Sequence, residues 1–220
     1  MRDAYHDDLE GLTDSLVEMT RIVGGAIGRA TQALIDADVA LADQVISNDE
    51  VVDSLRLDIE QRAFDLLARQ QPVASDLRAL ITALRIVSDL ERAGDLAEHV
   101  AKVARRRYPS SAIPPALRAT VLEMGQVAQR LVAKAGSVVS TRDVISALEL
   151  ERDDDVMDRL HGRLYKAILE GSWTGTVEEA VDVVLVGRYY ERFADHAVLV
   201  ARSVVYLVTG ETPETASTSI

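Results

Sequence analysis

The sequence predicts an all-α protein made of two tandem pseudo-repeated three-helix bundles, with six long helices in total. Apolar residues recur at three- and four-residue spacing through most of the 220 residues, as they do on the buried face of a helix. Only five prolines and twelve glycines interrupt this pattern, and few β-type runs lie between turn signals. An internal duplication is also present, because segment 48–55 (NDEVVDSL) aligns with 153–160 (DDDVMDRL) and segment 91–95 (ERAGD) aligns with 191–195 (ERFAD).

Three helices are expected in the first half, at about residues 3–36, 39–70 and 75–107. Asp38 is the expected N-cap of the second helix. Pro72 ends that helix, because proline disfavours helical geometry at the residue before it. The apolar stripes expected on the three helices are Leu9, Leu12, Leu16, Met19, Ile22 and Val23; then Ile46, Leu57, Phe64 and Leu67 beside Val45, Val52, Leu55, Ile59 and Leu66; then Leu77, Leu80, Leu84 and Val87.

A linker rich in proline and serine is expected at residues 108–115, after a helix that ends in Arg105–Arg107. The three arginines suit the negative end of the helix dipole. The second half repeats the pattern, with helices expected at about 115–140, 142–170 and 177–209. Their apolar stripes are Leu117, Val121, Met124, Ala128, Leu131 and Val132; then Ile145, Leu148, Met157, Leu160, Leu164 and Ile168; then Val177, Val181 and Val184.

The duplication divides the chain into two predicted domains. The first three-helix bundle is expected at residues 3–108 and the second at 115–209, followed by a disordered tail rich in Thr, Ser and Glu at 210–220. Antiparallel helices of this length, joined by short turns, form up-down-up bundles. Trp173, in the turn before the last helix, is expected to cover the end of the second bundle.

Composition excludes several classes of function. The chain contains no cysteine, so disulfides and thiolate metal sites are excluded and any metal must be held by oxygen or imidazole ligands. The formal net charge of −12 argues against nucleic-acid binding, which needs a basic surface. The N-terminus is acidic and unlike a signal peptide, and no run approaches about eighteen uninterrupted apolar residues. We therefore expect a cytoplasmic protein with no direct membrane insertion.

Two acidic pairs in the first half are expected to meet across a helical hairpin. Asp49 and Asp53 lie four residues apart on one predicted helix, and Glu91 and Asp95 lie four apart on the next, so each pair shares a helix face. Residues equally far from the turn lie side by side in an antiparallel hairpin. Pro72 is the midpoint between Asp53 and Glu91 and also between Asp49 and Asp95. All four carboxylates should therefore share one level, roughly 28–35 Å from the turn at about 1.5 Å per residue.

The second half gives the same result independently. Asp154 and Asp158 on one helix, and Glu191 and Asp195 on the next, are centred on the turn at residues 172–176. A random distribution of surface acids has little reason to produce this arrangement twice. The sequence thus predicts two acidic quartets, one in each bundle.

The residues alone leave open what these acids do. Four carboxylates within a few ångströms cannot all stay ionised alone, so they share protons, pair with basic side chains such as Arg92 and Arg192, or bind a hard cation. The duplication and the apolar flanks favour metal binding over an ordinary solvated helix face. His99 and His161 are expected to be packed or hydrogen-bonded side chains rather than ligands.

A family resemblance adds to this interpretation. The run Gln71–Arg78 (QPVASDLR), together with the two E-R-x-x-D runs, resembles the PhoU family of phosphate-uptake regulators over about residues 3–209. The resemblance implies tandem three-helix bundles in a non-enzymatic, cytosolic negative regulator of the phosphate-starvation response. Such regulators are thought to link the phosphate ABC transporter to a membrane sensor histidine kinase. A homodimer stays open as a further partner.

The resemblance also implies metal ions on the acidic E/D-x-x-x-D motifs. Some family members carry iron or zinc clusters there, and others use magnesium or manganese. The positions of this chain that match the metal ligands are Asp49, Asp53, Glu91, Asp95, Asp154, Asp158, Glu191 and Asp195.

Two departures from the family pattern concern the identity of the metal and the equality of the two sites. His99 and Leu199 stand where the family often has asparagine, and the second repeat has residues 173–176 (WTGT) where the first has Q-P-x-A-x-D-L-R. Two other functions stay open: a carboxylate-bridged di-metal enzyme in a helical bundle, and a structural adaptor whose acids bind nothing. The enzyme is less favoured, because ferritin-like sites need paired E-x-x-H motifs and the sequence has none.

Overall fold

Six long helices make up the protein, as the sequence predicts. The computed structural model describes residues 2–70, 72–170 and 173–211, apart from the side chains of residues 2–5 and 70. Within these ranges there is no strand. The helices are α1 (Arg2–Asp36), α2 (Val39–Gln70), α3 (Ser75–Arg107), α4 (Arg118–Thr141), α5 (Val144–Leu169) and α6 (Val177–Thr209), with a short 3₁₀ turn, η1 (Pro115–Leu117), before α4.

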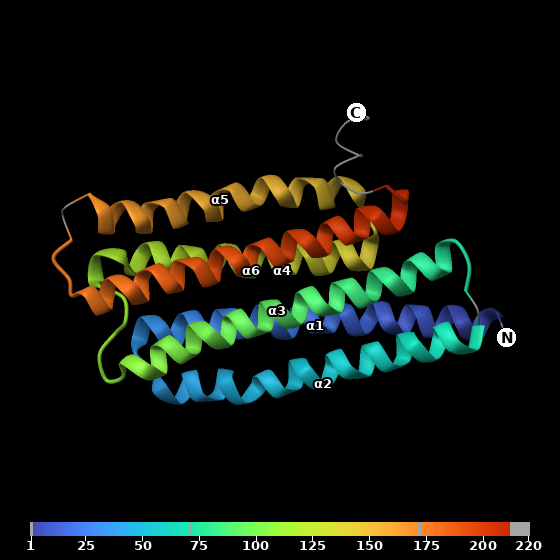
Figure 1. Ribbon diagram of the computed structural model, residues 1–220, viewed down its shortest axis with the longest axis horizontal. Coiled ribbons are helices and arrows are strands. Elements are labelled where there is room, and N and C mark those ends of the chain that lie inside the picture. The colour runs from blue at the N-terminus through green and yellow to red at the C-terminus, as the bar shows by residue number, and fades with distance from the viewer. Residues whose placement is uncertain (1, 71, 171–172, 212–220) are drawn as a thin grey trace.

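The helices run antiparallel along one long axis in two groups of three (Figure 1). Helices α1, α2 and α3 contact one another, and so do α4, α5 and α6. The groups meet through α1 against α4 and α3 against α6, so these four helices form the centre while α2 and α5 lie on opposite outer sides. The domain limits 3–108 and 115–209 stay a prediction, and most of the predicted tail lies outside the described residues.

Glycines allow the central helices α1 and α4 to approach closely. Gly136 of α4 lies against Thr20 of α1, and Gly125 lies against Thr31, so a Cβ at either glycine would collide with the threonine. The buried Thr31 Oγ1 also shares a 2.6 Å hydrogen bond with the hydroxyl of Tyr190 on α6. These contacts fix the antiparallel register of the two bundles, because sliding one helix along the other would place a side chain where only hydrogen fits.

Local signals define where several helices begin. The Asp38 carboxylate accepts a hydrogen bond from the backbone N–H of Leu41 at 3.0 Å, which confirms it as the N-terminal cap of α2. Thr176 and Glu179 form a reciprocal capping box at the start of α6, a signal that the sequence analysis did not use. Trp173 packs partly buried against the core in this turn, consistent with its expected place at the bundle end.

Several apolar residues expected on buried stripes are exposed instead. Leu57 and Phe64 of α2 are 56% and 55% exposed, because α2 packs on one side only and its other stripe, which includes Val45, Val52 and Ile59, enters the core. Ile145 near the start of α5 is 72% exposed. Val177 and Val181 of α6 are 81% and 51% exposed, because the inward face of that helix carries Asp182 and Val183.

The arginines at the end of α3 join the two bundles. Arg106 Nη2 lies 2.6 Å from Asp182 Oδ1 on α6, and Arg107 Nε pairs with Asp182 Oδ2. Arg107 also pairs with Glu178 at 2.7 Å. Asp182 is only 1% exposed, so its carboxylate depends on these two guanidinium groups in place of water. Arg105 instead pairs at 3.5 Å with the exposed Asp43 on α2.

We expect the double substitution Arg106→Gln/Arg107→Gln to lower the free energy of unfolding by roughly 3 kcal/mol, because it leaves a buried carboxylate without compensation. Arg105→Gln should cost less than about 1 kcal/mol, since it breaks an exposed pair. Adding Asp182→Asn to the double variant should restore most of the loss. Urea unfolding at pH 7 measures all three, and equal losses for the double variant and Arg105→Gln would contradict this account.

Candidate functional site

The structure brings the first acidic quartet together at the middle of the α2–α3 hairpin. Asp49 interacts electrostatically with Asp53 on its own helix and Asp95 on the next, and Glu91 interacts with Asp53 and Asp95. Gly94 of α3 lies close to α2: a Cβ there would stand 3.1 Å from Val52 Cγ1, a tight contact, and 3.4 Å from Asp49 Oδ1. The carboxylates therefore share one level, as the turn-centred register predicts.

The second quartet forms in the same way between α5 and α6. Asp154 interacts with Asp158, Asp195 and Glu191, which places all four acids in one electrostatic group. The neighbouring glycine on α6 is Gly187, which would carry its Cβ 3.0 Å from the His161 ring. In each repeat a glycine thus lets the outer helix pack closely: Gly94 faces α2 in the first repeat, and Gly187 faces α5 in the second.

Burial raises the pKa of carboxyls in both quartets. Loss of hydration is the main cause for Asp154, followed by the charges of Asp158 and Asp195, and together they raise its pKa to about 7. The pKa of Asp49 rises to about 6 through burial and the charges of Glu98 and Asp95. At neutral pH these groups therefore gain from any nearby positive charge, whether a proton, an arginine or a metal ion.

Arginines supply part of that positive charge. Arg56 of α2 pairs with Glu60 at 2.9 Å and reaches Glu91 at 4.0 Å. Arg92 lies 3.2 Å from Asp95 and 3.7 Å from Glu91.

Arg188 plays the matching part in the second quartet, donating to Glu191 Oε1 at 2.6 Å. Arg56 and Arg188 lie outside the E-R-x-x-D runs and were not among the basic partners predicted from the sequence. Their signal is the helical spacing of an arginine three residues from an acid.

The two quartets differ at two positions that carry a cation. Arg188 of the second repeat aligns with Ser88 of the first, because Glu191 aligns with Glu91. The alignment of Asp53 with Asp158 places Arg56 opposite His161, so a permanent cation in the first repeat is replaced by an imidazole in the second. His161 Nε2 and Asp154 Oδ1 are both buried and have no hydrogen-bond partner. Burial lowers the pKa of His161, which favours the neutral ring.

The donor atoms suit a hard or borderline metal ion, but they are not gathered into a coordination sphere. Carboxylate oxygens fit Mg²⁺, Mn²⁺ or iron, and the unpartnered Asp154 oxygen and His161 nitrogen are free to coordinate. Among the residues that the structure describes, however, no group of three or more His, Asp or Glu side chains is placed to hold an ion. Metal binding therefore requires the acids to leave their arginines and converge, and the eight ligands stay a prediction.

His99 and His196 make structural contacts. His99 Nδ1 donates to the backbone oxygen of Asp95 at 2.6 Å, and its ring lies 5.2 Å from that of Tyr189, which confirms it as a hydrogen-bonded, packed side chain. His196 Nδ1 lies 3.1 Å from Asp89 Oδ1 and links α6 to α3.

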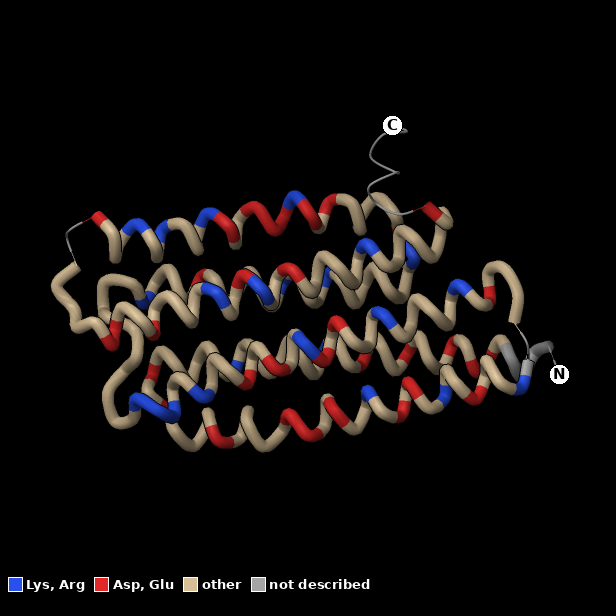
Figure 2. Tube along the Cα trace, in the orientation of Figure 1, with Lys and Arg blue, Asp and Glu red and all other residues tan. Residues whose placement is uncertain are grey.

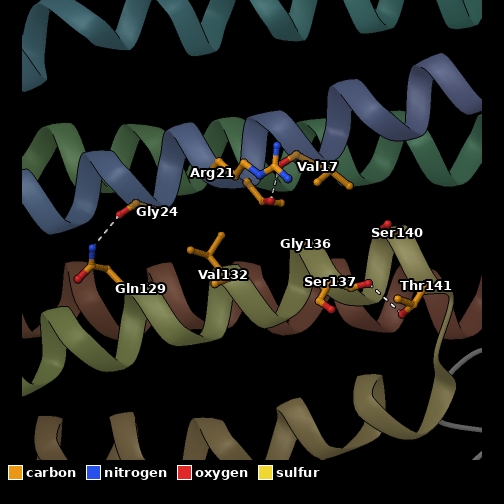
Figure 3. Close-up of a pocket in the computed structure, with 11 residues that line it drawn as sticks. Val17, Arg21, Gly24, Gln129, Val132, Gly136, Ser137, Ser140 and Thr141 are labelled. Atoms are coloured by element: carbon orange, nitrogen blue, oxygen red, sulfur yellow. Dashed lines mark hydrogen bonds between the residues drawn. The ribbon is translucent and has the colours of Figure 1, made fainter.

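A cavity of about 600 Å³ between α1 and α4 offers no comparable chemistry. Figure 3 shows its polar side chains arriving from both helices and bonding mostly to helix backbone. Thr20 donates to the oxygen of Val17 at 2.6 Å, and Gln129 donates to that of Gly24 at 3.3 Å. Elsewhere, no helix in the described part of the chain is long and apolar enough to cross a membrane.

Comparisons with known proteins agree with the sequence resemblance. The family model described as "PhoU domain" matches residues 16–104 and 121–204. "Phosphate-specific transport system accessory protein PhoU homolog 2" of Mycobacterium tuberculosis (strain ATCC 25618 / H37Rv) is 48% identical over 97% of this chain and 100% of its own length. Homolog 1 of Mycobacterium leprae is 47% identical over 97% of this chain and 96% of its own. The crystal structure of PhoU from Pseudomonas aeruginosa superimposes with a TM-score of 0.85 at 31% identity, covering 94% of this chain and 100% of that one.

The raised pKa of Asp154 predicts a pH dependence of stability. In the folded protein this carboxyl keeps its proton up to about pH 7, whereas in the unfolded chain it ionises near its ordinary value of 3.8. The folded state binds more protons between these values, so the free energy of unfolding contributed by this group falls as pH rises from about 4 to 7.

Asp154→Asn should therefore leave the free energy of unfolding nearly unchanged at pH 4 and raise it at pH 8 by on the order of 1 kcal/mol, allowing for solvent screening of a half-exposed group. Urea unfolding in a chelator measures the difference. Asp14→Asn, at an exposed position of α1, is the control. A smaller gain in the free energy of unfolding at pH 8 than at pH 4 would contradict the raised pKa of Asp154.

Proposed function

This chain belongs to the PhoU family, and from that premise we propose that it is a cytoplasmic, non-enzymatic accessory protein of phosphate transport that represses the phosphate-starvation response. It would link the phosphate ABC transporter to a membrane sensor histidine kinase through protein contacts. The observation that carries this proposal is the likeness to phosphate-transport accessory proteins across both repeats rather than in one bundle. The proposal leaves a homodimer open.

We also propose that both quartets bind metal ions through Asp49, Asp53, Glu91, Asp95, Asp154, Asp158, Glu191 and Asp195. The ion would be magnesium, manganese, iron or zinc, and its charge would take the place of the arginines and protons that now compensate the acids. Since each quartet spans two helices, a bound ion would tie the outer helix of each bundle to its neighbour. Metal binding would therefore change the position of the outer helix, and that change would alter the affinity for a partner.

A chelator-free preparation tests the metal proposal directly. Glu91→Ala/Asp95→Ala should lose about half of the bound metal measured by elemental analysis, because it empties one of two sites. The matched control is Glu18→Ala/Glu123→Ala, which removes two acids that are 55% and 49% exposed outside both quartets. Metal content unchanged in the first variant, or lowered equally in the control, would remove the metal sites from the proposal.

Deleting the gene should derepress phosphate-uptake genes in cells grown at high phosphate, because the kinase would lose its inhibitory link to the transporter. Transcript measurement of those genes at high and low phosphate provides the readout. Reintroducing the unaltered chain should restore repression. If expression of the phosphate-uptake genes stays low at high phosphate after the deletion, the proposed regulatory role is wrong.

A further inference from the structure

A second cavity lies where α3 meets α6, between the two acidic quartets and on the seam of the two repeats. Its volume is about 490 Å³, within the range of small-molecule sites. Most of its lining is basic or aromatic: Arg92, Arg188, Arg192, His99, His196 and Tyr189. Asp95 is the one acidic residue that lines it.

The arginines come from equivalent places in the two halves of the chain. Arg92 and Arg192 are the same position of the two E-R-x-x-D runs, and the antiparallel packing of α3 and α6 turns both toward one cavity. Figure 2 shows basic and acidic segments side by side along the middle of these two helices. The arginines of both runs thus meet at the central seam, where Asp95 is the one quartet acid that also lines the cavity.

These guanidinium groups have donors to spare. The side chains of Arg92 and Arg188 are 63% and 52% exposed. Each pairs with acids on its own helix, Arg92 with Asp95 and Arg188 with Glu191, which holds the side chain in place. An arginine carries five N–H donors in a planar fork, so such contacts leave others to face the cavity. Arg192 makes no ion pair within 4.0 Å among the described residues.

Three arginines and one aspartate line the cavity, and although Arg92 and Arg188 pair with neighbouring acids, their forks gather N–H donors at one place in a chain whose net charge is −12. Arginine forks match the oxygens of phosphoryl groups and bind them bidentately. Tyr189, braced by the His99 ring at 5.2 Å, adds an aromatic wall beside the arginines. The volume exceeds what a single phosphoryl group needs, which leaves room for a larger ligand that carries one.

We propose that this cavity is a binding site for a phosphoryl anion that bridges the two repeats through Arg92 and Arg192. The ligand is either free inorganic phosphate or pyrophosphate, or a phosphorylated small molecule such as a nucleotide. The site uses fixed cations of the protein, so it does not depend on the metal binding or regulatory role proposed above.

Isothermal titration of the full-length chain in a chelator tests the site. Orthophosphate, pyrophosphate and ATP are the probes, and sulfate is the control for any tetrahedral oxyanion. At least one phosphate probe should bind with one molecule per chain. Arg92→Gln/Arg192→Gln should weaken that binding about tenfold or more, because charge-assisted hydrogen bonds are lost. Arg163→Gln, which removes a 63% exposed arginine on α5, should leave it unchanged.

The probes separate the two sources. Binding of orthophosphate or pyrophosphate as tight as that of ATP assigns the site to the inorganic anion. Tighter ATP binding that Tyr189→Leu weakens assigns it to a nucleotide. The proposal is overturned if no phosphate probe binds, if sulfate binds equally well, or if a double variant with an unchanged circular dichroism melting curve binds like the parent. Binding that appears only when Mg²⁺ or Mn²⁺ replaces the chelator would also overturn it, because the ion would then hold the anion.

Discussion

Close antiparallel packing of long helices is the constraint on which the other features depend. At the α1–α4 contact, glycines meet threonines, so the two bundles fit together in one register. The same antiparallel arrangement at α3–α6 places the ends of the bundles against each other, where Arg106 and Arg107 reach the buried Asp182. Because the helices are long and continuous, the same register also sets which residues face one another at the middle of the molecule, where the acidic motifs lie.

The acids are tolerated in that position because the structure compensates them locally. Carboxylates partly withdrawn from water raise one another's pKa, and the cost is offset by arginines one helical turn away. The compensation is unequal: Arg56 serves the first quartet permanently, whereas the second has His161 with an unpartnered nitrogen. The second quartet has an arginine of its own, Arg188 beside Glu191, so the additional arginine comes from α2 in the first repeat and from α6 in the second.

The duplicated E-R-x-x-D run has two faces with different surroundings. Its acids interact with those of the outer helix of the same bundle, and its arginines meet at the seam between bundles, which Asp95 also lines. One short motif thus contributes to two kinds of site, one rich in oxygen donors and one rich in N–H donors. The charge of one kind of site affects the other, since Arg92 of the seam lies 3.2 Å from Asp95 of the first quartet.

Much of this protein could be read from the residues alone. Helical periodicity and the duplication determined the six helices, and turn-centred register determined that Asp49, Asp53, Glu91 and Asp95 would meet, because residue spacing fixes position along an antiparallel hairpin. Tertiary structure alone decided which apolar stripes are buried, and it leaves Leu57 and Phe64 exposed because α2, an outer helix, packs on one side only. It also decided that Asp182 is a buried partner of two arginines and that Arg92 and Arg192 line one cavity. Those contacts join residues about 75 to 100 positions apart, and their geometry depends on how the two bundles pack, which local spacing does not encode.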